Sequence, residues 1–350
     1  MTEASKRLVF FEAWADPVGE TIMARDPSID VQRLRFADPA AQNWQALTAA
    51  HVYHVRSSRD ELADQFAVDA AFLARCPNLL AVSTMGAGYD TVDVATCSRA
   101  GVIVVNQSGG NAEAVAEHAL GMMLTLAKRI GESDRAIRAR AGVERQDFIG
   151  HNIEGKTVGI VGLGNIGRRV AELCGSLFKM RVIAHDPYIS DRDFAERGAS
   201  RVPFEELLAA ADFVTVHCPR TEETENMLDA EAFGRMKSGA VFINTARGGI
   251  HDEAALFAGL DSGHLYGAGV DVWAVEPPAP DHPLLSLDNV LASPHTAGIS
   301  HESRYRIAQF AGEQLLDIFA GRRPPRLINP EVWPIFVERY EATFGNQGKS

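Results

Sequence analysis

Short apolar runs alternate with longer helical patterns along nearly the whole chain, and this alternation limits the fold more than any other feature. Parallel strands need a crossover segment between them, so a strand-helix series indicates an α/β protein with parallel sheets. The expected strands are 8–11, 31–36, 51–55, 79–84, 102–105, 157–161, 181–185, 213–216, 240–245, 267–270 and 290–292. The first five are enough for a small α/β domain, and the last six match the strand count of a doubly wound dinucleotide-binding fold.

One long helical pattern lies between the two strand series, and another follows the second series. The segment 112–128 is apolar on nearly all sides, which is typical of a helix buried between domains or subunits. The segment 300–321 follows the last strand and ends at a glycine followed by two prolines. If this late helix packs on the first domain, that domain is discontinuous in sequence.

Composition excludes several classes of protein. Of the 350 residues, 46% are hydrophobic and 23% charged, which supplies a core and a solvated surface and excludes a disordered or fibrous chain. The net charge of −12 disfavours nonspecific binding to nucleic acid or to an anionic membrane. The apolar runs are too short for a membrane span or signal peptide, so we expect a cytoplasmic protein. The cysteines form no CxxC pair, so we expect reduced thiols and no metal site.

The string GLGNIG, from Gly162 to Gly167, fits the GxGxxG pattern of dinucleotide-binding turns. By chance a chain this rich in glycine contains roughly 0.2 such strings, so the context must decide. A buried-strand run lies immediately before it and a helical pattern immediately after it, as the motif requires. There the glycines let the backbone approach a pyrophosphate at the helix amino terminus. The alternative is a tight strand-to-helix turn without a ligand.

Asp186 closes the next expected strand, 24 residues after Gly162. A carboxylate at this position can accept hydrogen bonds from the adenosine ribose hydroxyls and repels a 2′-phosphate, which predicts NAD in preference to NADP. The alternative is a surface turn residue in the pair Asp186-Pro187. The segment His217-Cys218-Pro219 also ends a strand, and we interpret it as a wall of the adenine pocket.

Arg247, Asp271 and His295 lie one to three residues beyond the ends of expected strands, at the edge where open α/β sheets bind ligands. The Arg247 guanidinium suits a substrate carboxylate, although a lone arginine is more often a surface residue. His295 can exchange a proton with a substrate hydroxyl during hydride transfer, although a lone histidine is usually structural. Glu276 can orient this imidazole and raise its pKa. Asp271 can accept a hydrogen bond from a nicotinamide carboxamide or cap a helix.

Together these motifs resemble those of the D-isomer-specific 2-hydroxyacid dehydrogenases, most closely their D-3-phosphoglycerate dehydrogenase-like branch. The matching strings are GLGNIG at 162–167, NTARGG at 244–249, GVDV at 269–272, EPP at 276–278 and SPHTAG at 293–298. The segment 106–121 also resembles the interdomain helix of that family. The likeness extends over about residues 50 to 330.

The resemblance implies a catalytic set in which Arg247 holds the substrate carboxylate and carbonyl, His295 is the general acid/base and Glu276 supports it. The expected NAD-binding residues are Gly162, Gly164, Asn165, Ile166, Gly167, Asp186, His217, Cys218, Pro219, Thr245, Ala246, Arg247, Asp271, His295 and Gly298. The expected substrate-binding residues are Arg56, Gly86, Ala87, Gly88 and Arg247. Arg56 occupies a position where some members contact a substrate phosphate, and the loop around Gly86 supplies backbone amides to the carboxylate.

The resemblance also implies two α/β domains, with a Rossmann NAD-binding domain inserted in a discontinuous, flavodoxin-like substrate domain. The expected parts are 1–108 for the first part of the substrate domain, 109–299 for the NAD-binding domain, 300–335 for the return to the substrate domain and 336–350 for a tail. The carboxyl-terminal regulatory domain of the long phosphoglycerate dehydrogenases is expected to be absent. A homodimer is expected through helix 112–128 and the Arg-rich stretch 135–145, which carry more apolar surface than one Rossmann face covers.

We therefore expect an NAD-dependent oxidoreductase that moves a hydride between nicotinamide and C2 of a D-2-hydroxy acid or 2-oxo acid. Phosphoglycerate is not favoured over another 2-hydroxy acid, and Glu276 argues against a formate dehydrogenase, which carries an amide there. The alternative from another class is an NAD(H)-sensing, corepressor-like regulatory protein, which would not need the set of Arg247, Glu276 and His295. A methyltransferase that used the glycine loop would leave Arg247 and His295 without a role.

Overall fold

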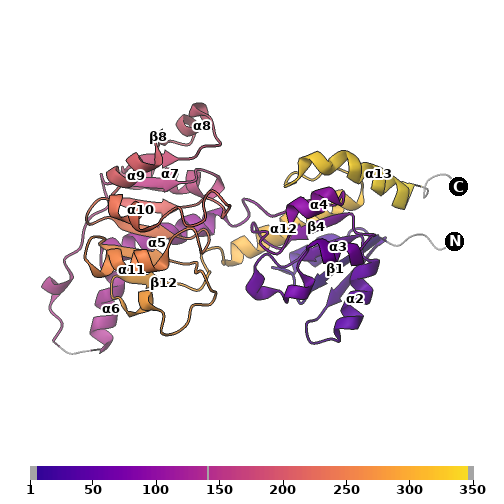
Figure 1. The fold of residues 1–350 in the computed structure, drawn as a ribbon, viewed down its shortest axis with the longest axis horizontal. Helices are drawn as coiled ribbons and strands as arrows, with labels where there is room; N and C mark the ends of the chain where they lie inside the picture. The colour runs from indigo at the N-terminus through magenta and orange to yellow at the C-terminus, as the bar shows by residue number, and fades with distance from the viewer. Residues whose placement is uncertain (1–5, 140–141, 346–350) are drawn as a thin grey trace. The chain divides into compact units, whose positions relative to one another are not determined.

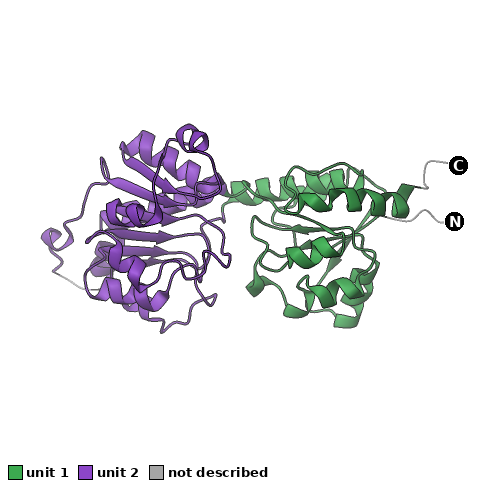
Figure 2. Ribbon diagram, turned by 45° about the horizontal axis from the view of Figure 1, so that its top comes forward, with its two compact units in different colours: residues 1–111, 300–350 green, residues 112–299 purple. Residues whose placement is uncertain are grey.

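The structure is a computed structural model that describes residues 6–139 and 142–345. The chain divides into two compact units, coloured separately in Figure 2. Unit 1 comprises residues 1–111 and 300–350, and unit 2 comprises residues 112–299. Both units are parallel sheets covered by helices (Figure 1), which confirms the expected α/β class.

Unit 1 contains a five-stranded parallel sheet in the order β2-β1-β3-β4-β5, which is the flavodoxin-like order. Its strands are β1 (Lys6–Phe11), β2 (Ile29–Leu34), β3 (Val52–Val55), β4 (Ala81–Thr84) and β5 (Ile103–Val105). Its helices are α1 (Val18–Met23), α2 (Ala40–Ala49), α3 (Ala70–Arg75), α4 (Val94–Arg99), α12 (His301–Phe319) and α13 (Trp333–Phe344). Helices α2, α3 and α4 pack on one face of the sheet, and α1, α12 and α13 pack on the other.

The late helix α12 belongs to unit 1, so this unit is discontinuous in sequence. It approaches α1 closely at Gly312, where a Cβ would lie 2.9 Å from Cβ of Ile22. After α12 the chain runs beside β5, where the backbone N–H of Ile328 donates to the carbonyl of Val104 over 2.8 Å. The Asn329 carboxamide oxygen accepts from the N–H of Val104 over the same distance. The carboxyl-terminal segment thus completes the unit that the amino-terminal segment begins.

The expected tail from residue 336 onward is wrong for residues 336–344, which belong to helix α13. Phe336 and Phe344 are buried, and Tyr340 lies between them at helical spacing with its hydroxyl donating to the carbonyl of Phe319 over 2.8 Å. This aromatic stripe was readable in the sequence, because residues four apart share one helix face. The last part of the expected tail, 346–350, lies outside the described residues.

Unit 2 contains a seven-stranded parallel sheet in the order β12-β11-β10-β9-β6-β7-β8, which is a doubly wound order. Its strands are β6 (Thr157–Val161), β7 (Arg181–His185), β8 (Ser200–Arg201), β9 (Phe213–Val216), β10 (Val241–Asn244), β11 (Gly267–Val270) and β12 (Val290–Ala292). Its helices are α5 (Ala112–Ala127), α6 (Ile130–Ala139), α7 (Asn165–Phe178), α8 (Asp191–Glu196), α9 (Phe204–Ala210), α10 (Ala230–Arg235) and α11 (Glu253–Asp261). The expected six strands omitted β8, whose two residues are exposed and carry no apolar run.

The central strands of unit 2, β6, β9, β10 and β11, are buried on both faces because helices cover both sides. Phe242 packs with α9, α10 and α11, whereas its neighbours Val241 and Ile243 pack with α5 and α7. Helix α5 lies so close to β11 that a Cβ on Gly269 would be 2.8 Å from Sδ of Met122. In the described part of the chain, no helix is both long and apolar enough to cross a membrane.

Candidate active site

The glycine turn, formed by GLGNIG at 162–167, lies at the carboxyl end of β6. Gly162 has a φ of +89°, and a Cβ there would lie 2.7 Å from the backbone nitrogen of Cys218, so both conformation and space require glycine. A Cβ on Gly167 would lie 2.1 Å from the carbonyl oxygen of Gly162, which brings the first turn of α7 against the turn. A Cβ on Gly164, in contrast, would have no neighbouring atom within 4 Å. The turn is therefore closed on the protein side and open where a pyrophosphate would approach.

Asp186 follows β7 and is held against the glycine turn. Its Oδ2 accepts a hydrogen bond from the N–H of Leu163 over 3.0 Å, and its Oδ1 accepts one from the N–H of Tyr188 over 3.0 Å. Each oxygen retains acceptor capacity, which suits the two hydroxyls of a ribose. The Tyr188 hydroxyl contacts the carboxylate of Glu223, which brings a second negative group to this region.

Two buried polar atoms without hydrogen-bond partners in the described chain lie at the same sheet edge. They are Nδ1 of His217, after β9, and Oγ1 of Thr245, after β10. Burial lowers the pKa of His217 to about 3, so its ring is neutral, and its Nε2 lies 2.9 Å from Oγ1 of Thr215. Buried polar groups are usually paired, so this edge has unused capacity for a polar ligand. The glycine turn, Asp186, His217 and Thr245 therefore fit a dinucleotide.

The loop that contains Arg247 is held by hydrogen bonds with Asn244 and by close packing at Gly248. The Asn244 side chain accepts from the N–H of Ala246 over 2.9 Å and donates to the carbonyl of Arg247 over 3.0 Å. A Cβ on Gly248 would lie 1.8 Å from the carbonyl oxygen of Trp273, so the loop packs directly on the backbone that follows β11. The side chain of Arg247 donates to the carbonyl of Ala246 over 2.7 Å.

His295, after β12, is hydrogen-bonded to Glu276, which lies between β11 and β12. Nδ1 of His295 lies 2.7 Å from Oε2 of Glu276, and the other carboxylate oxygen accepts from the N–H of Trp273 over 3.0 Å. If Nδ1–H donates to the carboxylate, Nε2 is the ring nitrogen left for a substrate. The side chains of His295 and Glu276 are 30% and 19% exposed, so the pair is partly shielded from water and can still be reached.

The charges around this pair set its protonation. The hydrogen bond with Glu276 raises the pKa of His295 against the effects of burial and of the Arg247 charge, which lower it. Burial alone would raise the pKa of Glu276, but the hydrogen bonds from His295 and Trp273 and the nearby positive charges lower it below its ordinary value. The pair therefore favours a charged imidazolium beside a charged carboxylate.

Asp271 lies after β11 and is fully buried. Its carboxylate accepts hydrogen bonds from the Ser293 hydroxyl over 2.6 Å, from the N–H of Thr296 over 2.8 Å and from the N–H of Ala297 over 3.0 Å. In this structure Asp271 therefore binds the loop that carries His295, a partner that neither interpretation of the sequence had considered. The role of Ser293 was also missed, although Ser293 is the first residue of the matched string SPHTAG.

The expected substrate residues of unit 1 lie at the carboxyl ends of β3 and β4. The Arg56 side chain is 23% exposed, lies 3.9 Å from Glu61 and has a buried Nε without a partner in the described chain. The N–H of Gly86 donates to the Ser57 hydroxyl over 2.6 Å, and the carbonyl of Ala87 accepts from Asn106 over 2.7 Å. The amide of Gly86 is thus already engaged within the protein.

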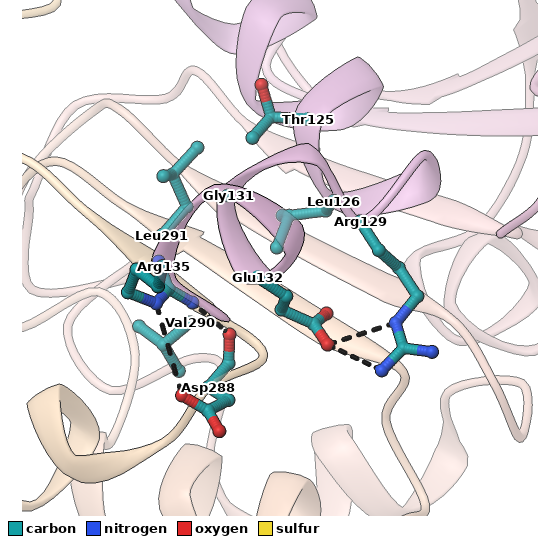
Figure 3. Close-up of a pocket in the computed structure, with 9 residues that line it drawn as sticks. All are labelled: Thr125, Leu126, Arg129, Gly131, Glu132, Arg135, Asp288, Val290 and Leu291. Carbon is teal, nitrogen blue, oxygen red and sulfur yellow. Dashed lines mark hydrogen bonds and ion pairs between the residues drawn. The ribbon is translucent and has the colours of Figure 1, made fainter. Parts of the chain in front are cut away.

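Unit 2 contains a small pocket between α5, α6 and β12 (Figure 3). Ion pairs join Arg129 to Glu132 over 2.6 Å and Arg135 to Asp288 over 4.0 Å along its rim. None of the expected catalytic, cofactor or substrate residues lines this pocket. Over the described residues, no group of three or more potential metal ligands occurs.

Comparison with known sequences identifies relatives over most of the chain. Residues 120–297 match the sequence model described as D-isomer specific 2-hydroxyacid dehydrogenase, NAD binding domain. The D-3-phosphoglycerate dehydrogenase of Archaeoglobus fulgidus is 38% identical over 271 residues, which cover 77% of this chain and 51% of that protein. The glyoxylate reductase of Korarchaeum cryptofilum is 39% identical over 269 residues, which cover 76% of this chain and 80% of that protein. The chain thus spans about half the length of the phosphoglycerate dehydrogenases that it matches.

Solved structures share the fold over almost the whole chain. The D-lactate dehydrogenase from Aquifex aeolicus, complexed with NAD and lactic acid, superposes with a TM-score of 0.79 at 26% identity and covers 92% of this chain and 98% of its own. The NAD-dependent formate dehydrogenase from Staphylococcus aureus, in complex with NAD, gives a TM-score of 0.75 at 27% identity and covers 91% of this chain and 96% of its own.

Proposed function

Because this chain belongs to the D-isomer-specific 2-hydroxyacid dehydrogenases, we propose that it transfers a hydride between nicotinamide and C2 of a D-2-hydroxy acid or 2-oxo acid. The observation that carries the proposal is the 2.7 Å contact between His295 and Glu276, with the Arg247 charge acting on both. Arg247, Glu276 and His295 lie after strands β10, β11 and β12. The same sheet contains β6 and β7, which lead into the glycine turn and Asp186. An acid/base pair and a candidate dinucleotide-binding site at the same edge of the sheet suit this reaction.

Unit 2 has the groups that would hold the cofactor. The glycine turn would receive the pyrophosphate, Asp186 the adenosine ribose, and His217 and Thr245 offer polar atoms along the same edge. When bound, NAD supplies the redox chemistry by accepting or donating a hydride at C4 of nicotinamide. The carboxylates of Asp186 and Glu223 disfavour a 2′-phosphate, so we propose NAD as the preferred form.

His295 would move the proton that accompanies the hydride. In reduction of a 2-oxo acid, Nε2 of the imidazolium gives its proton to the carbonyl oxygen as C2 receives the hydride, and the products are a hydroxyl and a neutral imidazole. In oxidation the neutral imidazole removes the hydroxyl proton. Glu276 stays ionised in both directions and stabilises the imidazolium. Arg247 would hold the substrate carboxylate and polarise the carbonyl.

For unit 1 we propose a role in substrate binding. Arg56 has a buried Nε without a partner in the described chain, so it has unused capacity to bind an anion. The amides of Ala87 and Gly88 remain candidate donors to the substrate carboxylate, whereas Gly86 would first have to release Ser57. D-3-phosphoglycerate dehydrogenases and a glyoxylate reductase are both among the relatives, so we propose a small 2-oxo acid without choosing its side chain.

The function is tested by NADH oxidation with a panel of glyoxylate, pyruvate, hydroxypyruvate and 3-phosphohydroxypyruvate. We expect turnover with at least one acid and its loss in His295→Ala. His264→Gln serves as the control, because His264 bonds the carbonyl of Phe233 over 3.1 Å and precedes β11 at the opposite end of the sheet. Tight NADH binding without turnover of any oxo acid would favour the regulatory alternative and contradict this proposal.

We also propose a homodimer formed through α5 and α6. Helix α6 has no buried residue, and Ile130 and Ile137 on it are 53% and 69% exposed. Ile149, after this helix, is also 69% exposed. Exposed isoleucines at this density are typical of a surface that another subunit covers. The cytoplasmic location stays a prediction.

A further inference from the structure

The loop that carries His295 has a backbone conformation that a non-glycine residue rarely adopts by itself. His295 has a φ of +54°, in the left-handed region. Asp271 holds this turn, because its carbonyl accepts from the N–H of His295 over 2.7 Å and its carboxylate accepts from Thr296 and Ala297. The direction of the catalytic ring therefore depends on how Asp271 itself is held.

Ser293 and His118 hold the Asp271 carboxylate. The Ser293 hydroxyl donates its only proton to Oδ1 of Asp271 over 2.6 Å, so its oxygen acts as the acceptor in the 3.1 Å contact with Nε2 of His118. This assigns a hydrogen to Nε2 of His118, which also lies 3.9 Å from the carboxylate. The indole N–H of Trp273 donates to the Ser293 carbonyl over 3.0 Å and fixes the same residue from another side.

We propose that His118 and Ser293 are positioning residues for the acid/base step. They orient Asp271, and through Asp271 they maintain the left-handed turn that places the His295 imidazole against Glu276. The inference rests on the proposed function for the role of His295, but the hydrogen-bonded chain itself is independent of any substrate.

Helix α5 is a rigid support for this chain. His118 lies near the middle of the helix, and its neighbours Ala116, Ala119 and Met122 are buried in the core of unit 2. The His118 side chain is 28% exposed, and its packed backbone lets it act as a fixed hydrogen-bond donor. A donor on a packed helix holds a loop more firmly than one on a second loop.

The position of His295 can be followed without substrate through the titration of its ring. The charged groups that act on His295 are Glu276, Arg247 and Asp271, and His118 is a further titratable group beside Asp271. Replacing Ser293 leaves all of these groups in place. A change in the His295 pKa on replacement of Ser293 would therefore report a change in geometry.

The experiment combines NMR titration of the His295 imidazole in the ligand-free protein with kinetics of oxo-acid reduction. The variants are Ser293→Ala, His118→Leu, the double variant and His118→Gln, which retains an N–H donor. We expect each of the first two to lower kcat roughly fivefold, the effect typical of one lost hydrogen bond, with a smaller effect on the KM for NADH. We also expect the His295 pKa to fall, because its contact with Glu276 loosens.

Two comparisons separate positioning from general destabilisation. If His118 acts through Ser293, the double variant should be no worse than Ser293→Ala, and His118→Gln should recover most of kcat. Glu117→Gln, an exposed neighbour on α5, is the matched control and should change neither readout. An unchanged His295 pKa and kcat, or effects that multiply in the double variant, would overturn the proposal. If no oxo acid is turned over, the proposed function fails, but the NMR titration still decides this inference.

Discussion

At the residue scale, opposite charges at close range decide how the His295–Glu276 pair works. The hydrogen bond with Glu276 raises the pKa of His295, so the imidazolium needed for reduction persists to higher pH than in an unpaired histidine. The lowered pKa of Glu276 keeps its carboxylate charged over the same pH range. Reduction should therefore be fast at low pH and slow down as pH rises through the raised pKa of His295.

Glu276→Gln should move this pH limb to lower values. The substitution keeps the shape and a hydrogen bond but removes the negative charge, while burial and Arg247 continue to lower the pKa of His295. We expect residual activity near pH 5 to 6, below the ordinary histidine pKa of about 6.5. The measurement is kcat/KM for oxo-acid reduction against pH. Profiles of wild type and variant that differ only in scale would show that Glu276 does not act on His295.

Asp186→Ala should weaken the use of NAD and narrow the difference between NAD and NADP. The substitution removes the ribose acceptor and one charge that repels a 2′-phosphate, but Glu223 remains in contact with Tyr188, so we expect narrowing without reversal. The ratio of kcat/KM for the two cofactors is the measurement. Asp191→Ala removes an equal charge from a side chain that is 85% exposed and serves as the control. A ratio unchanged from wild type would place Asp186 outside the cofactor site.

At the scale of elements, the site depends on loops that pack backbone against backbone beyond the strand ends. The loop after β10 rests on the backbone after β11 at Gly248, and the loop after β12 is bonded to Asp271 at the end of β11. Strand β11 is thus the common support for the loops of Arg247 and His295. Its paired neighbours in the sheet are β10 and β12.

Gly248→Ala should destabilise the protein, although alanine usually stabilises where its conformation is allowed. A Cβ 1.8 Å from the carbonyl oxygen of Trp273 forces the two loops apart, so we expect the free energy of unfolding to fall by about 2 kcal/mol or more. Denaturant unfolding measures this change. Gly234→Ala in α10, where a Cβ meets no atom within 4 Å, should instead raise stability by up to about 1 kcal/mol. Equal effects of both substitutions would refute the close contact.

At the scale of the whole molecule, the chain forms one unit from a continuous segment and another from both of its ends. Unit 1 is complete only with α12 and α13, since Phe319 and Phe336 pack with Leu8 and Phe10 of β1 in one core. Residues more than 300 positions apart in sequence therefore stabilise the same sheet. Unit 2 places α5 and α6 beside its edge strand β12, where Figure 3 shows their polar and apolar side chains together.

The proposed dimer should appear as a mass near twice the 38.0 kDa of one chain in light scattering at micromolar concentration. Ile137→Glu places a charge on an exposed position of α6 and should shift the protein toward the monomer, because burying an unpaired charge is costly. Ile335→Glu is the control and should leave the mass unchanged, because Ile335 lies on α13 of unit 1 and is 46% exposed. A wild-type monomer would exclude the dimer at that concentration.

The sequence by itself determined the α/β class, every strand except β8 and the residue types that follow the strands. Strands β6, β7, β9, β11 and β12 begin and end where their apolar runs predicted. The GLGNIG string required a tight turn, and the structure places glycine there with a positive φ. These features are local, because an apolar run, a glycine or a proline limits the backbone of its own segment wherever that segment lies.

Only the tertiary structure decided which polar groups meet. The sequence did not predict that the Asp271 carboxylate would hold the loop of His295, nor that the Ser57 hydroxyl would accept the hydrogen bond of the Gly86 amide. His118 had no motif that linked it to Ser293, which lies 175 positions away. Hydrogen bonds need partners within about 3 Å, and the pattern of one segment does not specify which distant segment will supply them. That pairing is set when helices and strands pack around a common core.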